Sequence, residues 1–422
     1  MSDQPVIGID VAKRQSQACL LAPDRNERVK ELIFVHTLAG LRKLLALCWW
    51  AAEKFSYLPV LILEATGHYS RLISDFLRFH GLETYVINQI QTKNFASVSM
   101  RKVKNDRVDA FHIAMFFRLG LVKPTREFPA ESLKLRELCR HYFSLQRLLT
   151  NTKLKCQSLV DQVFWRFDEV FSASASRTAS EVLKRFPTPQ QLAEQPVDEI
   201  AALIQQHSRS KMEVACERAE KLILLAQEAQ FLAKASAVQE FRLQSLLKLE
   251  STLSQEVRAL HKRIKQEAEK HPEVCLVMTV PGFGPITSAA FIGEIGSYEL
   301  YPSAAQIIAA AGIDPTVYQS GAYQGSHSRM SKRGSTWLRL ALYQAAAVAA
   351  WGPIKHQVER YATIRAFYQK KRNEGKPPKV ALGAVMRKLC VYAYVVLSKN
   401  KDFENPSVSK ASENIASPEP EF

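Results

Sequence analysis

Two short apolar runs that each end near an acidic residue place the strongest constraint on the fold of this chain. Residues 5–13 read PVIGIDVAK and residues 58–67 read LPVLILEATG, so Asp10 and Glu64 stand at the ends of segments typical of buried strands. An ionised carboxylate is very costly to bury without a partner. The two acids therefore indicate a site that needs negative charge, and the alternative is a polar turn residue after each strand.

The rest of the first 120 residues alternates strand and helix patterns. Apolar runs predict further strands, and a helical periodicity predicts helices between them. These strands are residues 16–23, 31–37 and 83–88, and these helices are residues 38–55 and 69–81. Three strands followed by strand and helix in alternation predict an α/β domain with a mixed central sheet over residues 1–125.

Two aspartates lie three residues apart in the basic stretch KVKNDRVDA. On a helix, Asp106 and Asp109 would share one face, so their carboxylates would point together and repel. A divalent cation would relieve this repulsion, and so would the basic neighbours Lys102, Lys104 and Arg107. The alternative is a solvated helix start whose acids offset the helix dipole.

Four carboxylates on two strand ends and one helix face suit two-metal phosphoryl chemistry. Such sites hold two cations about 3.5–4 Å apart, one beside the attacking oxygen and one beside the leaving oxygen. Hard oxygen ligands favour Mg²⁺ or Mn²⁺. The seven cysteines are scattered and form no CxxC pair, which argues against a disulfide framework and a structural zinc site.

The charge of the chain indicates a polyanionic partner. The net charge is +16, and residues 401–422 hold two lysines and five acidic residues, so residues 1–400 carry +19. Nucleic acid is the leading partner for such an excess, and an anionic membrane surface is the weaker alternative. We see no apolar run of 18 residues, no signal peptide and no lipidation motif, so we expect a soluble protein of the bacterial cytosol with no membrane partner.

Heptad patterns predict two long helices in a connector at residues 130–271. Apolar residues at this spacing form a seam between paired helices, either in a hairpin within one chain or in a stalk between protomers. The first seam is Leu135, Leu138, Tyr142, Leu145, Leu149, Thr152, Cys156, Leu159 and Val163. The second seam is Leu246, Leu249, Leu253, Val257, Leu260 and Ile264. Between them, residues 173–205 read as short helices broken by prolines, with no role that we assign.

Residues 272–400 are predicted to be helical and to contact phosphates. In PGFG, Gly282 and Gly284 predict a tight turn that exposes backbone N–H groups at a helix start, as in a helix-hairpin-helix; a plain connection between packed helices is the alternative. Further on, cations among small residues suit phosphate contacts. These cations are Arg329, Lys332, Arg333 and Arg339. The composition of residues 401–422 predicts a disordered tail.

The phrases GIDVAK, LEATGHY and KNDRVDA together resemble the DEDD transposases of bacterial insertion sequences, the group related to the Piv DNA invertase. The segment from PGFG through SKRG to WLRLALYQAA resembles the C-terminal transposase domain of the same family. The resemblance implies a RuvC-like domain of the RNase H fold, a coiled-coil connector and a helical C-terminal domain. It also implies that Asp10, Glu64, Asp106 and Asp109 are metal ligands.

The resemblance further implies a serine nucleophile, DNA as substrate and a structured bridge RNA as guide. The matching serine is Ser320, and Ser326, Ser328 and Ser331 are alternatives in the same segment. The family combines acids and serine in one composite active site, which implies a homo-oligomer, either a dimer or a tetramer. Two other functions stay open: a metal-dependent junction nuclease without serine chemistry, and a non-catalytic nucleic-acid-binding scaffold.

Overall fold

The structure is a computed structural model, and the chain divides into two compact units, Met1–Glu127 and Phe128–Phe422. The residues that it describes are 4–23, 27–88, 106–121, 128–171, 176–232, 236–316, 319–320, 323–324, 329–352 and 358–405. The side chains of residues 68, 106–108, 230–232, 319–320, 323–324 and 358–360 are not among them. Each unit is described by itself.

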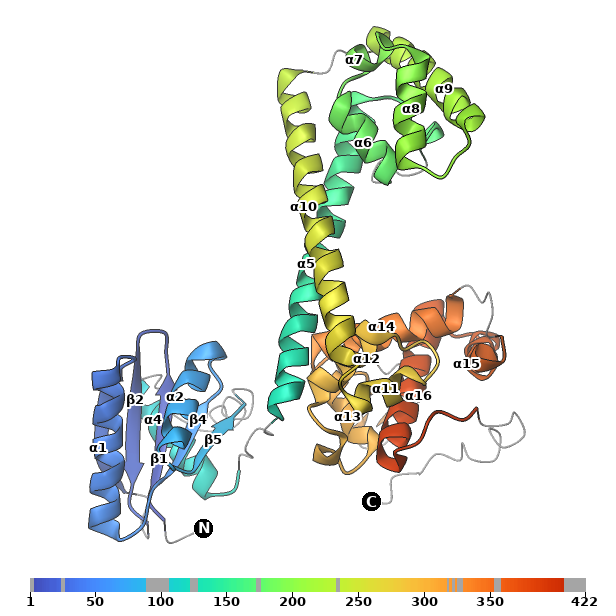
Figure 1. Cartoon of the computed structure of the whole chain (residues 1–422). Helices are drawn as coiled ribbons and strands as arrows, with labels where there is room; N and C mark the ends of the chain where they lie inside the picture. Colours follow the sequence, from blue (N-terminus) through green and yellow to red (C-terminus); the bar gives the residue numbers. More distant parts are fainter. Residues whose placement is uncertain are drawn as a thin grey trace. The chain divides into compact units, whose positions relative to one another are not determined.

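Unit 1 is built on a five-stranded mixed sheet in the order β3-β2-β1-β4-β5 (Figure 1). Its strands are β1 (Val6–Val11), β2 (Gln15–Leu21), β3 (Arg28–Val35), β4 (Val60–Glu64) and β5 (Thr84–Ile87). β1, β2 and β3 pair antiparallel, whereas β4 pairs parallel with both β1 and β5. The mixed sheet predicted from the sequence is confirmed.

Helices cover both faces of this sheet. α1 (Leu38–Phe55) and α2 (Gly67–Phe79) pack on the face that holds Ile7 and Ile9, and α4 (Asp106–Arg118) packs on the face that holds Val6. Successive strand residues point to opposite faces, so Val6, Gly8 and Asp10 all point toward the α4 side. Asp10 of β1 therefore lies on the face of the sheet that α4 covers.

Unit 2 begins with a long antiparallel helical hairpin. α5 (Ala130–Val163) packs along α10 (Ala237–Ala268), with Lys153 opposite Glu250 and Tyr142 opposite His261 (Figure 1). The sequence left a hairpin and an inter-protomer stalk open, and the structure shows the hairpin within one chain. Beyond its far end lies a small helical bundle with its own core. Its elements are η1 (Phe167–Glu169), α6 (Arg177–Arg185), α7 (Pro189–Ala193), α8 (Val197–His207) and α9 (Met212–Leu232).

The predicted seam of the second helix is wrong at one position. Leu249 is 48% exposed, whereas its neighbour Glu250 is 7% exposed. The buried seam continues through Val257 and Ile264, which the sequence pattern did include. The pattern favoured a leucine over a glutamate, but the ion pair of Glu250 with Lys153 at 3.7 Å offsets the burial of its carboxylate.

The rest of unit 2 is a helical domain packed against the near end of the hairpin. Its elements are α11 (Pro272–Met278), α12 (Pro285–Ile295), η2 (Tyr298–Leu300), α13 (Ala304–Ala311), β6 (Gln319–Ser320), β7 (Tyr323–Gln324), α14 (Thr336–Trp351), α15 (Val358–Asn373) and α16 (Pro378–Lys399). The short pair β6-β7 is the one β element among its described residues, and the sequence did not predict it. The helical C-terminal segment is confirmed.

One described helix, α16, is long and apolar enough to cross a membrane by length and composition alone. Arg387 and Lys388 interrupt this apolar run, so the sequence did not predict it. In the structure 61% of the apolar window is buried within the protein, and α16 packs against α11, α13, α14 and α15. The helix is therefore packed as a core helix of unit 2.

After α16, Phe403 packs on Tyr392 with ring centroids 4.9 Å apart, and Thr363 donates to Asn405 Oδ1 at 3.2 Å. The predicted disordered tail is therefore wrong for residues 401–405, which are docked, and its residues 406–422 lie outside the described residues.

Candidate active site

Asp10 and Glu64 come together because their strands are parallel neighbours in register. Ile9 of β1 pairs with Leu63 of β4, so the next residue on each strand is an acid. Both acids therefore stand side by side at the carboxyl ends of the two strands, and both point to one face of the sheet. Glu64 is buried at 9% exposure and Asp10 is half-buried.

The helix that carries the other two acids is pinned to this face by a glycine. A Cβ atom added at Gly8 would stand 2.1 Å from the carbonyl oxygen of Ala110 and 2.7 Å from the backbone nitrogen of Ala114. No side chain fits in that space, so α4 lies directly on β1, two residues before Asp10. Positions four residues apart lie on the same side of a helix. The first backbone position of α4, residue 106, is therefore on the same side of the helix as Ala110, which lies against the sheet.

The structure describes the four predicted acids to different extents. Asp109 is half-buried on α4, whereas only the backbone is described at Asp106, the first residue of that helix. The backbone of Arg107 also lies in α4. Lys102 and Lys104 lie outside the described residues.

A hollow beside Asp10 adds two cations that the sequence analysis missed. Its volume is about 330 Å³, and Lys13, Arg14 and Gln17 help to line it. Lys13 and Arg14 lie on the turn between β1 and β2, directly after the acid. The signal in the sequence is the pair of cations that directly follows GIDVA.

The donor set at this sheet edge fits a divalent cation. Asp10, Glu64 and Asp109 offer carboxylate oxygens, which hard cations prefer, and the burial of Glu64 favours a positive charge beside it. Among the described side chains, the group whose ligand atoms lie within 4.8 Å of one another is Glu131, Glu267 and His271 in unit 2, whereas Asp10, Glu64 and Asp109 are not that close together.

That group in unit 2 is explained by ion pairs. Lys134 lies 2.7 Å from Glu131, and Lys270 lies 2.9 Å from Glu267. Both acids are therefore already neutralised by lysines at the base of the α5-α10 hairpin. The predicted metal ligands remain those at the sheet edge of unit 1.

The segment that carries Ser320 is closed at its base by a backbone ladder. The bonds run from the amides of Thr316, Ser331, Lys332 and Ser335 to the carbonyls of Arg329, Asp314, Gly312 and Ala310, at 2.7–2.9 Å. Ser320 lies in β6, where its backbone pairs with Tyr323 of β7. Its side chain, and all of Ser326, His327 and Ser328, lie outside the described residues.

The fourth serine of this segment is engaged in the ladder. The hydroxyl of Ser331 donates to Asp314 Oδ1 at 2.6 Å. This bond orders the base of the loop and gives Ser331 a structural role. Ser320 stays the predicted nucleophile, with Ser326 and Ser328 still open as alternatives.

The predicted phosphate-binding cations lie on or beside this ladder. Arg329, Lys332 and Arg333 are exposed, whereas Arg339 is half-buried and donates to the carbonyl of Ala311 at 2.8 Å. Lys332 has φ of 54°, a left-handed backbone that non-glycine residues adopt at some energetic cost and that is often found at functional sites.

The two glycines of PGFG differ in their surroundings. Gly282 is buried with φ of 87°, and a Cβ there would stand 2.2 Å from the carbonyl of Ala345 on α14, so packing alone requires this glycine. Gly284 caps α12 and has open space around it, but its N–H donates to the hydroxyl of Thr287 at 2.8 Å. Phosphate binding at this turn stays a prediction. Of the two glycines, Gly284 is the better placed for it, because the space around it is open.

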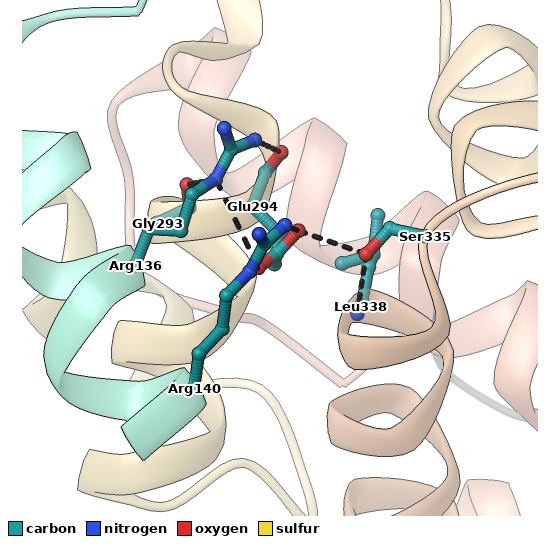
Figure 2. A network of polar contacts seen from close by, with 6 residues as sticks. All are labelled: Arg136, Arg140, Gly293, Glu294, Ser335 and Leu338. Atoms are coloured by element: carbon teal, nitrogen blue, oxygen red, sulfur yellow. Dashed lines mark hydrogen bonds and ion pairs between the residues drawn. The ribbon is translucent and has the colours of Figure 1, made fainter. Parts of the chain in front are cut away.

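A buried carboxylate ties three helices of unit 2 together (Figure 2). The side chain of Glu294 on α12 is 2% exposed and accepts from Arg140 of α5 at 2.6 and 2.9 Å. It also accepts from the hydroxyl of Ser335 at 2.8 Å, and that hydroxyl caps α14 at Leu338. The network thus fixes the start of α14, directly after the ladder that holds the Ser320 segment.

Two family models match the chain, and both describe transposases. One, a transposase of the IS110 DEDD type, matches residues 7–165, and the other, transposase of the IS116/IS110/IS902 family, matches residues 275–362. Together they cover more than half of the 422 residues.

Curated relatives agree with these models. The pilin gene-inverting protein of Moraxella bovis is 29% identical over 136 residues, which is 32% of this chain and 40% of that protein. An IS116 protein of 44.8 kDa from Streptomyces clavuligerus is 23% identical over 81% of this chain and 83% of its own length. The chain thus spans about 40% of the length of the pilin-inverting relative and most of the IS116 protein.

Among solved structures, the RuvC protein of T. thermophilus in complex with a Holliday junction substrate has 12% identity and a TM-score of 0.22. The match covers 29% of this chain and 99% of that one.

A mixed sheet with acids at its edge, followed by a long helical hairpin and a helical domain, defines a multidomain protein of the DEDD class. The chain belongs to the IS116/IS110/IS902 family of transposases.

Proposed function

We propose that this protein is a DNA transposase that cuts and rejoins strands at the ends of an insertion sequence. The observation that carries the proposal is the register of Asp10 and Glu64, with α4 pinned beside them through Gly8. The acids on all three elements fall within residues 7–165, which the DEDD family model matches, and this match supports the proposal.

The acids are proposed to hold a divalent cation, Mg²⁺ or Mn²⁺, through Asp10, Glu64, Asp106 and Asp109. When bound, such a cation neutralises charge on a phosphate during strand transfer. Lys13 and Arg14 beside Asp10 suit the DNA phosphates next to the cut, because cations near a phosphodiester both bind and orient it.

Ser320 is proposed as the nucleophile. Its oxygen would lose a proton and form a bond to phosphorus, while the bond from phosphorus to one deoxyribose oxygen breaks and that oxygen takes up a proton. The energy of the broken bond stays in the phosphoserine ester, so the strands can be rejoined without ATP. Support comes from the match of residues 275–362 to the transposase family and from the ordered ladder at the base of this segment.

The proposed partners are DNA, a structured bridge RNA as guide, and further copies of this chain. The charge of +19 on residues 1–400 supports a nucleic-acid partner of either kind. Exposed apolar side chains on the hairpin, such as Leu154 at 63% and Phe241 at 70%, support an oligomer. The functional boundaries at residues 125, 271 and 400 and a location in the bacterial cytosol belong to the same proposal.

Cleavage by the Asp106→Asn variant tests the metal site. The substrate is DNA that flanks the gene, supplied with RNA transcribed from the same region, in Mn²⁺ or in EDTA. Wild-type protein should cleave only with metal, and Asp106→Asn should be inactive with an unchanged melting temperature, because removing one of two close carboxylates relieves repulsion in the metal-free protein.

The matched control is Asp75→Asn, which removes an acid from α2 whose side chain is 61% exposed. This variant should cleave like the wild type. An Asp106→Asn protein that cleaves normally, or that unfolds, would contradict the assignment.

A further inference from the structure

A groove on unit 2 has cationic walls and an apolar floor. Its volume is about 1070 Å³, which is the upper end of the range for a small-molecule site. It lies between α14, α16 and the ladder below Ser320. No described carboxylate lines it, and six cations do. These cations are Arg329, Lys332, Arg339, Lys376, Lys379 and Arg387.

The two α16 cations of the groove are free to meet a ligand. Lys379 and Arg387 are exposed and form no ion pair with any carboxylate among the described residues. By contrast, Lys376 lies 3.6 Å from Glu374, and Arg339 already donates to a backbone carbonyl. Lys379 and Arg387 are eight residues apart on α16, so they lie on one helix face about 12 Å apart.

Between these two cations the helix presents a glycine and thereby opens the floor. Gly383 lies one turn from each cation, and a Cβ there would stand 3.6 Å from the methyl group of Met330. Tyr343 of α14 is 39% exposed and Val380 is 55% exposed, both on the lining of the groove. An exposed aromatic ring among cations is the arrangement that binds unpaired bases, because the ring stacks on a base while the cations hold the phosphates.

The wall of the groove is the base of the serine loop. Pro315 and Met330 form a bridge that closes this loop, and both line the groove together with Arg329. A strand lying in the groove therefore lies next to the segment that holds Ser320. A volume of about 1070 Å³ accommodates one unpaired nucleotide with its flanking phosphates.

We infer that this groove binds the DNA strand that is to be cut, with one unpaired base stacked on Tyr343 and its phosphates on Lys379 and Arg387. The inference rests on the proposed function only in naming the bound DNA as the strand that is cut. The binding of single-stranded DNA itself needs neither metal nor chemistry. The site adds three cations, Lys376, Lys379 and Arg387, and the aromatic ring of Tyr343 to the residues predicted from the sequence.

Binding of a fluorescein-labelled oligothymidine by the full-length protein in EDTA tests the groove, by anisotropy over a range of salt. For single strands, the slope of log K against log salt becomes shallower by about 0.7 for each phosphate that the protein no longer neutralises. Lys379→Ala and Arg387→Ala should each reduce the slope by about that amount. Lys399→Ala, which removes an exposed lysine at the end of the same helix, should leave it unchanged.

Variants of Tyr343 and Gly383 on the floor of the groove separate the contribution of base stacking to binding from that of charge. Tyr343→Ala should weaken binding about tenfold with an unchanged salt slope, and Tyr343→Phe should bind like the wild type, because the ring is kept. Gly383→Leu should fill the groove and weaken binding, whereas Gly383→Ala should be tolerated, because its methyl group would stand 3.6 Å from Met330. Circular dichroism of each variant checks that the fold is kept.

Photocrosslinking locates the strand directly. An oligonucleotide with one 4-thiothymidine should crosslink to Tyr343 or to Met330, as mapped by mass spectrometry. The inference is overturned if the salt slopes of Lys379→Ala and Arg387→Ala match that of the Lys399→Ala control, or if Tyr343→Ala binds normally. It is also overturned if oligouridine binds at least tenfold more tightly than oligothymidine, because that result would assign the groove to RNA. A wild-type protein that binds in the groove but never forms a serine adduct would instead overturn the proposed function alone.

Discussion

Gly8 of β1 and Ala110 of α4 lie so close that a Cβ at residue 8 would stand 2.1 Å from the Ala110 carbonyl oxygen. This close approach sets the distance between the sheet, which carries Asp10 and Glu64, and the helix, which carries Asp106 and Asp109. The geometry of the proposed metal site therefore depends on a residue that has no side chain.

Gly8→Ala should displace α4 and weaken the binding of Mn²⁺ at least tenfold, as measured by calorimetry. The overpacking should also lower the free energy of unfolding by about 1–3 kcal/mol. The control is Gly81→Ala, where φ is 74° and no atom lies within 4 Å of the added methyl group. That variant should be destabilised by about 1 kcal/mol through backbone strain while Mn²⁺ binding stays unchanged. An equal weakening of metal binding in both variants would show that the packing of α4 on β1 is not the cause.

Replacing Glu294 should destabilise unit 2 strongly. Glu294→Ala removes the buried acceptor of Arg140 and Ser335, so we expect the free energy of unfolding in urea to fall by about 1.5–3 kcal/mol. Arg140→Met tests the pair, and in the double variant the two effects should not add. The exposed pair of Arg185 with Glu199 is the control, because breaking it should change stability by less than about 1 kcal/mol. A similar small change for Glu294→Ala would contradict the network.

The stability of unit 1 should fall as the pH drops below about 6.5. Burial lowers the pKa of His112 below its usual value; the nearby charge of Asp109 opposes this shift, whereas that of Arg28 adds to it. The unfolded state takes up a proton on this histidine before the folded state does, so acid favours unfolding until the lowered folded pKa is passed. Thermal melts at pH 7.5 and 5.5 should show the decrease, and His112→Gln should reduce it. An unchanged pH dependence in His112→Gln would exclude this histidine as its source.

An introduced aspartate should have different effects on the buried and the exposed faces of the α5-α10 hairpin. Leu149 is buried at 7%, so Leu149→Asp should unfold the hairpin and lower the free energy of unfolding in urea by about 3 kcal/mol or more. Leu154 and Phe241 are exposed and line one groove of about 600 Å³, so Leu154→Asp with Phe241→Asp should dissociate the oligomer and keep the helix content. Light scattering and circular dichroism separate the two outcomes. A monomeric wild-type protein that is fully active would contradict the proposed oligomer.

Much of the fold could be predicted from local sequence patterns. The strands that end at Asp10 and Glu64 and the long helices of the connector follow from short-range periodicity, which a single sequence displays. The register that sets Asp10 beside Glu64 depends on which strands pair, and that is a long-range property. The buried Glu250 was missed for a similar reason, since its partner Lys153 lies on the other helix of the hairpin.

The site was predicted in part. The acids could be found because charge at the end of an apolar strand is unusual, whereas Lys379 and Arg387 are cations within the long apolar helix α16. Only the packing of α16 beside α14 and the serine loop brings these cations to one groove. The same holds for Glu294, whose two arginine partners lie more than 150 residues away in sequence.

Mapping a trapped adduct tests whether a serine of this chain attacks DNA. Wild-type protein is incubated with its guide RNA, metal and a nicked suicide DNA substrate, and the denatured adduct is digested and sequenced by mass spectrometry. The account predicts a phosphodiester on Ser320, its absence in Ser320→Ala, and unchanged Mn²⁺ binding in that variant. An adduct on Ser326, Ser328 or Ser331 would move the nucleophile within the segment. Cleavage of the DNA by the wild type without any adduct would contradict attack by a serine and indicate a junction nuclease.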